Sequence, residues 1–200
     1  MSRPGGLATL ATIVTLVSPC LGLAQPASTA KPAADFEIQI IGTHAAEFEM
    51  LVHRYSELRD RLMRGLPAAV VTDDVARIQR HTRSLAAAIR DARRGAVQGE
   101  FFTPATSAEF KVILDLTVDA SVWALIMDDN PGAFAYTTDG AYPEGKPRST
   151  MPGIILQRLP HLPDDIEFRF TGTHLILYDV RANTVIDRLP DAIGRRKGDH

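Results

Sequence analysis

The chain has 200 residues, and its 22 Lys and Arg residues nearly balance its 24 Asp and Glu residues, which gives a formal net charge of -2. This small charge argues against nucleic acid or an anionic membrane as the main partner. The single cysteine, Cys20, excludes an intrachain disulfide, and beyond the N-terminal segment no apolar run is long enough to cross a membrane.

The N-terminal segment has the pattern of an export signal. Arg3 supplies a positive charge, and residues 7–17 form an apolar run interrupted only by threonine. The run suits the apolar part of a signal peptide but is too short to cross a bilayer of roughly 30 Å. Small residues at Gly22 and Ala24 predict cleavage after Ala24. The sequence therefore predicts a signal peptide over residues 1–24 and a periplasmic or secreted protein.

Cleavage after Ala24 would remove Cys20 and leave a mature chain without cysteine. Such a chain has no disulfide, no thiolate nucleophile and no cysteine-ligated metal. The alternative is a lipid-modified Cys20 at the start of the mature protein. A lipobox has a small residue before its cysteine, and Pro19 in that position argues against lipidation.

Residues 25–34 (QPASTAKPAA) are rich in Pro, Ala, Ser and Thr, and they predict a flexible tether. This stretch also argues against reading residues 7–17 as a core helix of the fold. A single domain is expected over residues 35–193, which is long enough for an apolar core. Residues 194–200 are expected to form a disordered tail.

Apolar residues at three- and four-residue spacing predict two amphipathic helices in the first half of the domain. The first covers about residues 35–64, although Gly42 and the isoleucines before it also fit a strand or a separate short helix. The second begins after Thr72-Asp73-Asp74, where a capping hydroxyl precedes acidic residues, and runs to about Arg94. The short, proline-containing connection suggests an antiparallel helical hairpin.

A third helix is expected over residues 105–128, because Thr103 can cap it and Pro104 suits its first turn. This is the most apolar stretch of the mature chain and should lie at the centre of the core. A Gly-, Pro- and Tyr-rich loop follows over residues 130–150, and loops of this length tend to be functional or mobile. A short helix over residues 151–159 completes the helical part.

The C-terminal end has the pattern of a small β-sheet. Residues 166–170 alternate apolar and polar side chains, and residues 175–179 and 184–189 are two further apolar segments between turns. Asn183 suits the left-handed conformation of such a turn. The predicted fold class is therefore α+β, with three main helices and one short helix packed against a C-terminal three-stranded antiparallel meander.

No catalytic or metal-binding motif is present. The six histidines include no HExxH arrangement, and the chain has no GxSxG elbow and no phosphate-binding glycine pattern. The acidic residues Asp128-Asp129-Asn130, Asp139 and Glu144 could hold Ca²⁺, but they lack the pattern of an EF-hand loop and fit a solvated helix end better. The sequence does not exclude a pair of carboxylates that catalyses glycoside hydrolysis, since the distance between two such groups is set by the fold. The sequence therefore predicts no metal and no cofactor.

The second helix offers one candidate binding surface. Arg83, Arg90 and Arg94 share one face of it, opposite the apolar residues. They could bind an anion, a lipid headgroup or an acidic partner. A solvated helix face is the simpler explanation, because nearby aspartates offset part of the charge.

The 130–150 loop offers the other candidate surface. Its aromatic residues Phe134, Tyr136 and Tyr142 stand among Gly and Pro residues. Exposed aromatic rings on a loop could contact a ligand or a partner. The same rings could equally fold back onto the core.

Several segments share a recognisable pattern: LPDDIEFRF (162–170), LILYD (175–179) and PDAI (190–193), with GEFFTP (99–104) and TMP (150–152) upstream. Together they resemble a group of exported proteobacterial and acidobacterial proteins, over most of residues 45–193. Members of that group commonly have valine where this chain has Thr171. The group has no assigned activity, so the resemblance implies export and a single domain and supplies no catalytic residue.

These observations favour a non-enzymatic periplasmic protein that binds a small ligand or an envelope protein partner. The alternative is a hydrolase acting on an envelope substrate, with histidines and carboxylates that meet only in the fold. A structural envelope protein is a third alternative. A deep pocket that gathers two or more His, Asp or Glu side chains would favour the hydrolase.

Overall fold

The computed structural model describes residues 32–67 and 73–194, with side chains from His44 onward. The predicted signal peptide with its cleavage site, the Thr72 cap and the tail from residue 195 lie outside the described residues. The described part contains five helices and four strands: α1 (Pro32–Arg64), α2 (Val75–Ala92), α3 (Pro104–Thr117), α4 (Ala120–Asp128), β1 (Gly140–Ala141), α5 (Gly153–Leu156), β2 (Ile166–Thr171), β3 (His174–Asp179) and β4 (Thr184–Leu189).

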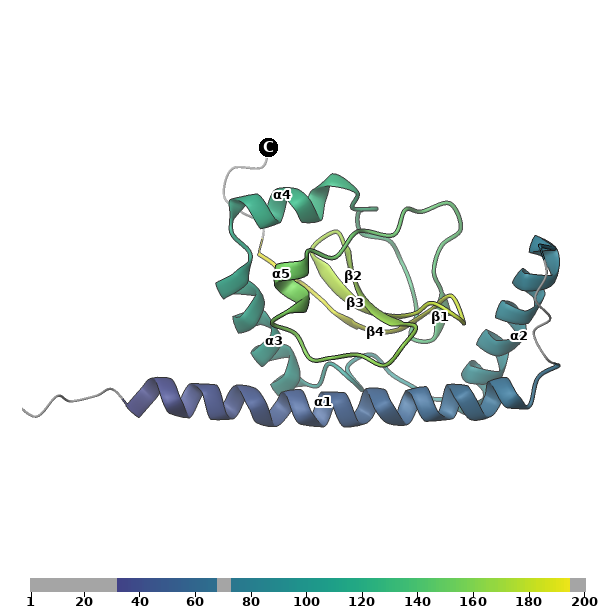
Figure 1. The fold of residues 1–200 in the computed structure, drawn as a ribbon, viewed down its shortest axis with the longest axis horizontal. Helices are drawn as coiled ribbons and strands as arrows, with labels where there is room; N and C mark the ends of the chain where they lie inside the picture. Colours follow the sequence, from purple (N-terminus) through teal and green to yellow (C-terminus); the bar gives the residue numbers. More distant parts are fainter. Residues whose placement is uncertain (1–31, 68–72, 195–200) are drawn as a thin grey trace, which may run out of the picture. The chain divides into compact units, whose positions relative to one another are not determined.

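The strands form one antiparallel sheet in the order β1-β4-β3-β2 (Figure 1). Strands β2 to β4 are the predicted meander, and the α+β fold class is confirmed. Asn183 in the β3–β4 turn has φ 49°, the left-handed conformation expected of it. The sheet also has a fourth strand that was not predicted: β1 pairs Gly140 with Val185 and Ala141 with Thr184. Two residues are too few to show an alternating pattern.

Helix α1 is continuous and begins at Pro32, before the predicted start near Asp35, with no separate element in its first turns. Its buried residues Phe48, Val52 and Tyr55 belong to the core that packs on the sheet. This sheet contact replaces the expected antiparallel hairpin with α2, which runs at a steep angle to α1 (Figure 1). None of the helices within the described ranges is both long and apolar enough to cross a membrane.

The predicted third helix is in fact two helices, α3 and α4, that meet at Val118 and Asp119. Thr103 caps α3 as predicted, since its Oγ1 accepts a hydrogen bond from the backbone N–H of Thr106. At the break, the Asp119 carboxylate accepts hydrogen bonds from the N–H groups of Ser121 and Val122. Asp119 is thus the N-cap of a new helix, and its acceptors replace the helical bonds that the break removes.

The sheet is covered on both faces. The helix face packs against residues from all five helices. Its core includes four phenylalanines, Phe48, Phe102, Phe110 and Phe168, of which Phe48 and Phe110 each contact the other three rings. The loop face packs against the 130–150 loop, through a smaller cluster of Tyr142, Ile176, Tyr178 and Val185 with Phe134 and Tyr136 beside it. The two faces therefore have separate cores.

A β-bulge changes the phase of β4 relative to β3. Leu177 pairs with Asp187 and Tyr178 pairs with Val185, so Ile186 has no partner on β3. An extra residue in one strand lets two successive side chains lie on the same face. Ile186 and Asp187 accordingly both lie on the helix face.

Candidate functional site

A cavity of about 650 Å³ lies between α2, the loop after β1 and the β3–β4 turn. We call it the α2–loop cavity. Its lining comes from three parts of the chain: Ile78, Gln79, Thr82 and Arg83 of α2, then Ala141 of β1 with Tyr142, Pro143, Glu144 and Arg148 of the loop that follows it, and Val180 and Asn183 of the turn. Arg83 and Tyr142, two of the residues singled out from the sequence, therefore lie at one site.

The α2 wall of the cavity is the N-terminal half of an amphipathic helix. The C-terminal half of the same helix is packed against the core. Asp74 caps the helix by accepting a hydrogen bond from the N–H of Arg77. The buried residues of α2 are confined to its second half: Leu85, Ala86 and Ile89. In the first half Ile78 is 51% exposed. Ile78 is therefore the apolar side chain that α2 contributes to the cavity, and the core does not cover it.

The loop wall is held by hydrogen bonds to the sheet. The backbone N–H of Asp139 donates to Val185 O, and that of Tyr142 donates to Asn183 O. The Tyr142 hydroxyl donates to Pro147 O at 2.6 Å, and the Tyr178 hydroxyl donates to Asn183 Oδ1 at 2.7 Å. Burial raises the pKa of both tyrosines, so their hydroxyls stay neutral donors. The start of the loop wall is therefore fixed to β4 and the β3–β4 turn, and Pro147 near its far end is bonded back to Tyr142.

The cavity has two arginines and one carboxylate at its rim. Arg83 comes from α2 and Arg148 from the loop, and Glu144 lies on the loop beside them. Within the described residues no carboxylate is in ion-pair distance of either arginine. The Arg148 guanidinium lies 5.6 Å from the ring centroid of Tyr178, which orients it without neutralising it. Two uncompensated guanidinium groups make the rim suitable for an anion.

The other arginines of the predicted face lie elsewhere. Arg90 is exposed and does not line the α2–loop cavity. Arg94 is exposed and pairs with Asp91 one turn before it. The predicted face is thus divided: Arg83 contributes to the cavity, whereas Arg90 and Arg94 are solvated.

The aromatic residues of the loop fold back onto the sheet. Phe134 contacts both Tyr136 and Tyr142 in edge-on geometry, with ring centroids 5.4 Å and 5.2 Å apart. Tyr142 in turn contacts Tyr178 of β3. Phe134 and Tyr136 are half-buried and do not line the cavity, so Tyr142 alone of the three contributes to it.

Sequence reasoning missed three buried aspartates that connect the elements of the fold. Asp187 accepts hydrogen bonds from the backbone N–H groups of Gly99, Phe101 and Phe102, and so attaches the turn before α3 to β4. Asp179 accepts from the Tyr55 hydroxyl, and Asp139 from Arg93 Nε. In the sequence these aspartates look like ordinary polar residues of strands and loops. The one available signal was Asp179, which follows directly on the apolar residues of LILYD (175–179).

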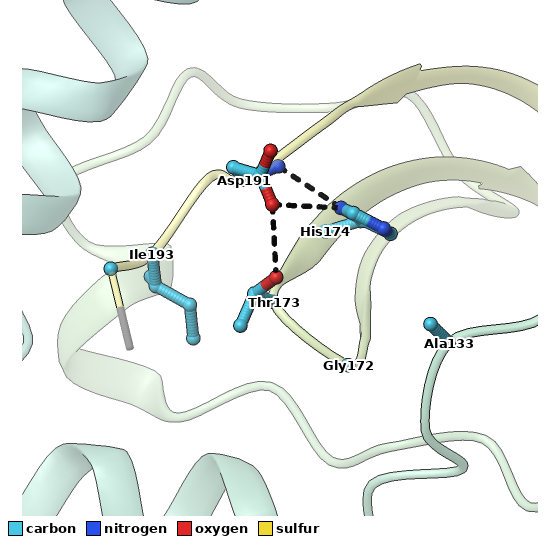
Figure 2. Close-up of a pocket in the computed structure, with 7 residues that line it drawn as sticks. Ala133, Gly172, Thr173, His174, Asp191 and Ile193 are labelled. Atoms are coloured by element: carbon cyan, nitrogen blue, oxygen red, sulfur yellow. Dashed lines mark hydrogen bonds and ion pairs between the residues drawn. The ribbon is translucent and has the colours of Figure 1, made fainter. Parts of the chain in front are cut away.

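A second cavity of about 410 Å³ brings one histidine and one aspartate together (Figure 2). His174 Nδ1 accepts a hydrogen bond from the backbone N–H of Asp191, and the Thr173 hydroxyl donates to Asp191 Oδ1. A nucleophilic triad needs the hydroxyl to donate to the imidazole. Here the imidazole acceptor atom is already occupied, and the Asp191 side chain is 80% exposed. These hydrogen bonds hold the turn at Thr173 and His174 against Asp191, and they do not form a nucleophilic triad.

The acidic stretch after α4 is used for internal hydrogen bonds. The Asp129 carboxylate accepts from the N–H and hydroxyl of Thr150, and Asn130 bonds the backbone of Gly172 through both its amide atoms. A Cβ at Gly172 would lie 3.0 Å from Ala133 N, so this contact needs glycine. Among the described residues no group of three or more His, Cys, Asp or Glu side chains is placed to hold a metal ion.

Comparisons with protein-family models, with curated proteins and with solved structures give no match. The case for a function therefore rests on the geometry of the α2–loop cavity.

Proposed function

We propose that this chain is an exported, non-enzymatic protein that binds a small organic anion with an apolar body in the α2–loop cavity. One observation carries the proposal: Arg83 and Arg148 come from separate elements to one cavity, and neither forms an ion pair with a carboxylate in the part of the chain that the structure describes. The same cavity is also lined by the apolar side chains Ile78 and Val180.

The two halves of this ligand follow from the two parts of the site. Guanidinium groups bind carboxylate, sulfonate or phosphate oxygens through charge-assisted hydrogen bonds. Burying Ile78 and Val180, which are both exposed in the free protein, favours an apolar ligand body by about 25 cal/mol per Å² covered. Glu144 at the rim disfavours ligands with many negative charges.

Binding of two fluorescent probes tests this function. 1-Anilinonaphthalene-8-sulfonate carries a permanent negative charge on an aromatic body, and N-phenyl-1-naphthylamine is the same body without the charge. We expect saturable binding of the sulfonate, weakened by about fivefold in Arg83→Gln and in Arg148→Gln, since partly exposed charge pairs contribute up to about 1 kcal/mol. Binding of the neutral probe should change by less than about twofold in both variants, because only the charge is lost.

Arg90→Gln is the matched control, because it removes the same charge from the exposed part of the same helix. It should leave sulfonate binding within about twofold of the wild type. Equal losses in Arg83→Gln and Arg90→Gln would show a general charge effect and overturn the proposal. Near-UV circular dichroism of each variant excludes probe binding to a loosened core.

Export is supported by the pattern of residues 1–24 and by the resemblance to exported proteins. The intact mass of protein recovered from the periplasm tests it, with a mature chain expected to begin at Gln25. A mass corresponding to all 200 residues would contradict it. Ligand carried through the same purification and released unchanged would support binding without turnover, whereas turnover in a hydrolase panel would favour the alternative.

A further inference from the structure

Asn183 is a lining residue of the α2–loop cavity whose backbone is held in place. It lies in the β3–β4 turn in the left-handed conformation, with φ 49°. Its carbonyl oxygen accepts a hydrogen bond from the backbone N–H of Tyr142 at 3.0 Å, and its own N–H donates to Val180 O at 3.4 Å. The side chain of Asn183 therefore starts from a fixed point on the cavity wall.

The side chain of Asn183 is held by a buried tyrosine. The Tyr178 hydroxyl donates a hydrogen bond to Asn183 Oδ1 at 2.7 Å. Tyr178 itself is fully buried, and its ring belongs to the cluster of the loop face. A side chain packed in this way has little freedom to move, and it transmits its fixed position to the amide that it bonds.

The hydrogen bonding of Tyr178 sets which end of the amide faces it. If the amide were turned over, its NH2 group would donate to the hydroxyl, and the hydroxyl would need another acceptor for its own proton. Burial raises the pKa of Tyr178, so the hydroxyl keeps that proton. Its other polar neighbour, Arg148, has only donors. A buried hydroxyl without an acceptor is costly, so the amide oxygen faces Tyr178.

This orientation leaves the NH2 group of Asn183 available to a ligand. Within the described part of the chain no group accepts a hydrogen bond from Nδ2, and Nδ2 is not among the enclosed side-chain atoms that lack a partner. Gln79 and Thr82 also line the cavity, but no hydrogen bond among the described residues orients their side chains. Asn183 thus presents an oriented neutral donor, whereas these two side chains are free to turn.

The neutral donor and one charged donor of the cavity lie around the same tyrosine. The Arg148 guanidinium lies 5.6 Å from the centroid of the Tyr178 ring, and the hydroxyl of that ring bonds Asn183. Both groups therefore lie within about the length of one side chain of each other. A single small ligand can contact the charge and the amide together.

We propose that Asn183 is a specificity-determining residue, whose NH2 group donates to a neutral carbonyl oxygen of the ligand, and that Tyr178 is the positioning residue for this amide. The inference rests on the function proposed above and narrows its ligand. The ligand class becomes organic anions that carry a carbonyl group a few bonds from the charge, as keto acids and N-acyl amino acids do. An oriented donor disfavours ligands that leave it unpaired.

Two carboxylates that differ in one group test this preference. 4-Oxo-4-phenylbutanoate and 4-phenylbutanoate have the same charge, ring and chain, and the first has a carbonyl where the second has a methylene. We expect titration calorimetry at about pH 7 to show about threefold to tenfold tighter binding of the ketone, the range of one neutral hydrogen bond. The methylene compound is the more apolar, so burial alone predicts the opposite order. Equal affinities, or tighter binding of the methylene compound, would overturn the proposal.

Asn183→Asp removes both donors of the amide and keeps an acceptor for the Tyr178 hydroxyl. The backbone should tolerate it, because Asp139, Asp165 and Asp191 also have positive φ in this chain. The new negative charge should weaken binding of both compounds, and the ketone should lose its advantage, since a carboxylate offers its carbonyl no donor. A preference for the ketone that survives in Asn183→Asp would show that another group provides it and would overturn the proposal.

Gln79→Glu is the matched control, because it makes the same change from amide to carboxylate at another lining position. It should weaken binding of both anions and keep the ratio of the two affinities within about twofold of the wild-type ratio. A loss of the ratio in Gln79→Glu as large as in Asn183→Asp would assign the effect to the added charge and contradict the role of Asn183.

Tyr178→Phe tests the positioning role. The ring that lies against Arg148 stays, and only the hydroxyl that orients the amide is lost. We expect the affinity for 4-phenylbutanoate to stay within about twofold of wild type, and the preference for the ketone to fall towards one. A general loosening of the site would weaken both compounds together and leave their ratio unchanged. An unchanged ratio would therefore refute the positioning role of Tyr178.

The same measurements separate this inference from the proposed function. If neither carboxylate nor 1-anilinonaphthalene-8-sulfonate binds, the proposed function fails and the inference fails with it. If these anions bind and Arg148→Gln weakens them, but the ketone has no advantage, the proposed function stands and the role of Asn183 is overturned.

Discussion

The two faces of the sheet are covered in different ways and are built from different side chains. On the helix face the central contacts are between phenylalanines, with Phe48 within 5.0 Å to 5.8 Å of three other ring centroids. On the loop face the rings are largely tyrosines, and arginines lie over them: Arg148 over Tyr178 and Arg188 over Tyr136.

The difference arises because the helices and the loop find hydrogen-bond partners for their backbone N–H and C=O groups in different ways. A helix pairs its N–H and C=O groups internally, so the side chains beneath it can be wholly apolar. A loop leaves carbonyl groups unpaired, and tyrosines can pack their rings on the sheet while donating hydrogen bonds to these groups. Tyr142 does this with Pro147 O. The loop face therefore relies on polar contacts where the helix face relies on apolar area.

Phe48→Ala should give the largest loss of stability, because it removes a fully buried ring from the centre of the helix face. We expect the free energy of unfolding to fall by about 3–5 kcal/mol. Phe134→Ala on the loop face removes the same side chain from a half-buried position and should cost about 1–2 kcal/mol. Urea denaturation of both variants measures the difference, and equal losses would remove the distinction between the faces.

Asp187→Asn tests the main polar contact of the helix face. Both carboxylate oxygens accept backbone N–H groups, Oδ1 from Gly99 and Arg188 and Oδ2 from Phe101 and Phe102. An amide has one acceptor oxygen, so in either orientation its NH2 group faces two of these donors. Leaving buried donors unsatisfied should cost about 2–3 kcal/mol. Arg188→Gln is the neighbouring control, because its side chain lies on the loop face over Tyr136. Similar losses in the two variants would contradict the assignment of the buried carboxylate to the helix face.

Tyr142→Phe isolates the polar contribution of the loop face. The ring stays, and only the hydrogen bond to Pro147 O is lost. We expect a loss of about 1 kcal/mol in unfolding free energy. Faster hydrogen exchange of the amides in residues 143–148, with unchanged exchange in β3, would show that the hydroxyl holds the loop and not the sheet. Unchanged exchange in the loop would refute this role.

Asp179→Asn should have the smallest effect, which is a change in pH dependence. Burial raises the pKa of Asp179 above its unfolded value despite its contacts with Ala182 and Arg59. The contribution of this group to stability is therefore fully present below about pH 4 and is lost as pH rises through the folded pKa. The unfolding free energy of wild type minus that of Asp179→Asn should fall between about pH 4 and pH 7. Asp115→Asn, at an exposed position of α3, controls for the loss of a charge.

Local signals in the sequence predicted the elements that depend on local physics. The alternation of residues 166–170, the Asn183 turn and the Thr103 cap all correspond to the structure. The break at Asp119 was missed because its cap lies inside an apolar run, where the spacing still fits one helix. The prediction of an antiparallel hairpin was wrong, because the spacing of apolar residues shows that α1 has an apolar stripe but does not show which surface covers that stripe.

The candidate site was only partly predictable for the same reason. Arg83 and Tyr142 were singled out from charge and aromatic patterns, and the structure brings them to one cavity. Arg148, which lines the same cavity, lies in a loop, where no helical or strand periodicity indicates which way a side chain points. Arg93 looked like one more arginine of a basic helix, although its position next to the helix end places it in the interior. Contacts between residues far apart in the chain leave no local pattern.

Strand β4, the last of the described strands, is an inner strand of the sheet, between β1 and β3. Its Asp187 bonds amides that lie 85 to 88 residues earlier. During synthesis, β4 leaves the ribosome after every other described element, so the growing polypeptide has neither the pairing nor the carboxylate that its earlier parts require. Topologies dominated by such distant contacts form late and slowly. The described domain therefore cannot complete its sheet until β4 has been synthesised, although most of its helical core precedes that strand in the chain.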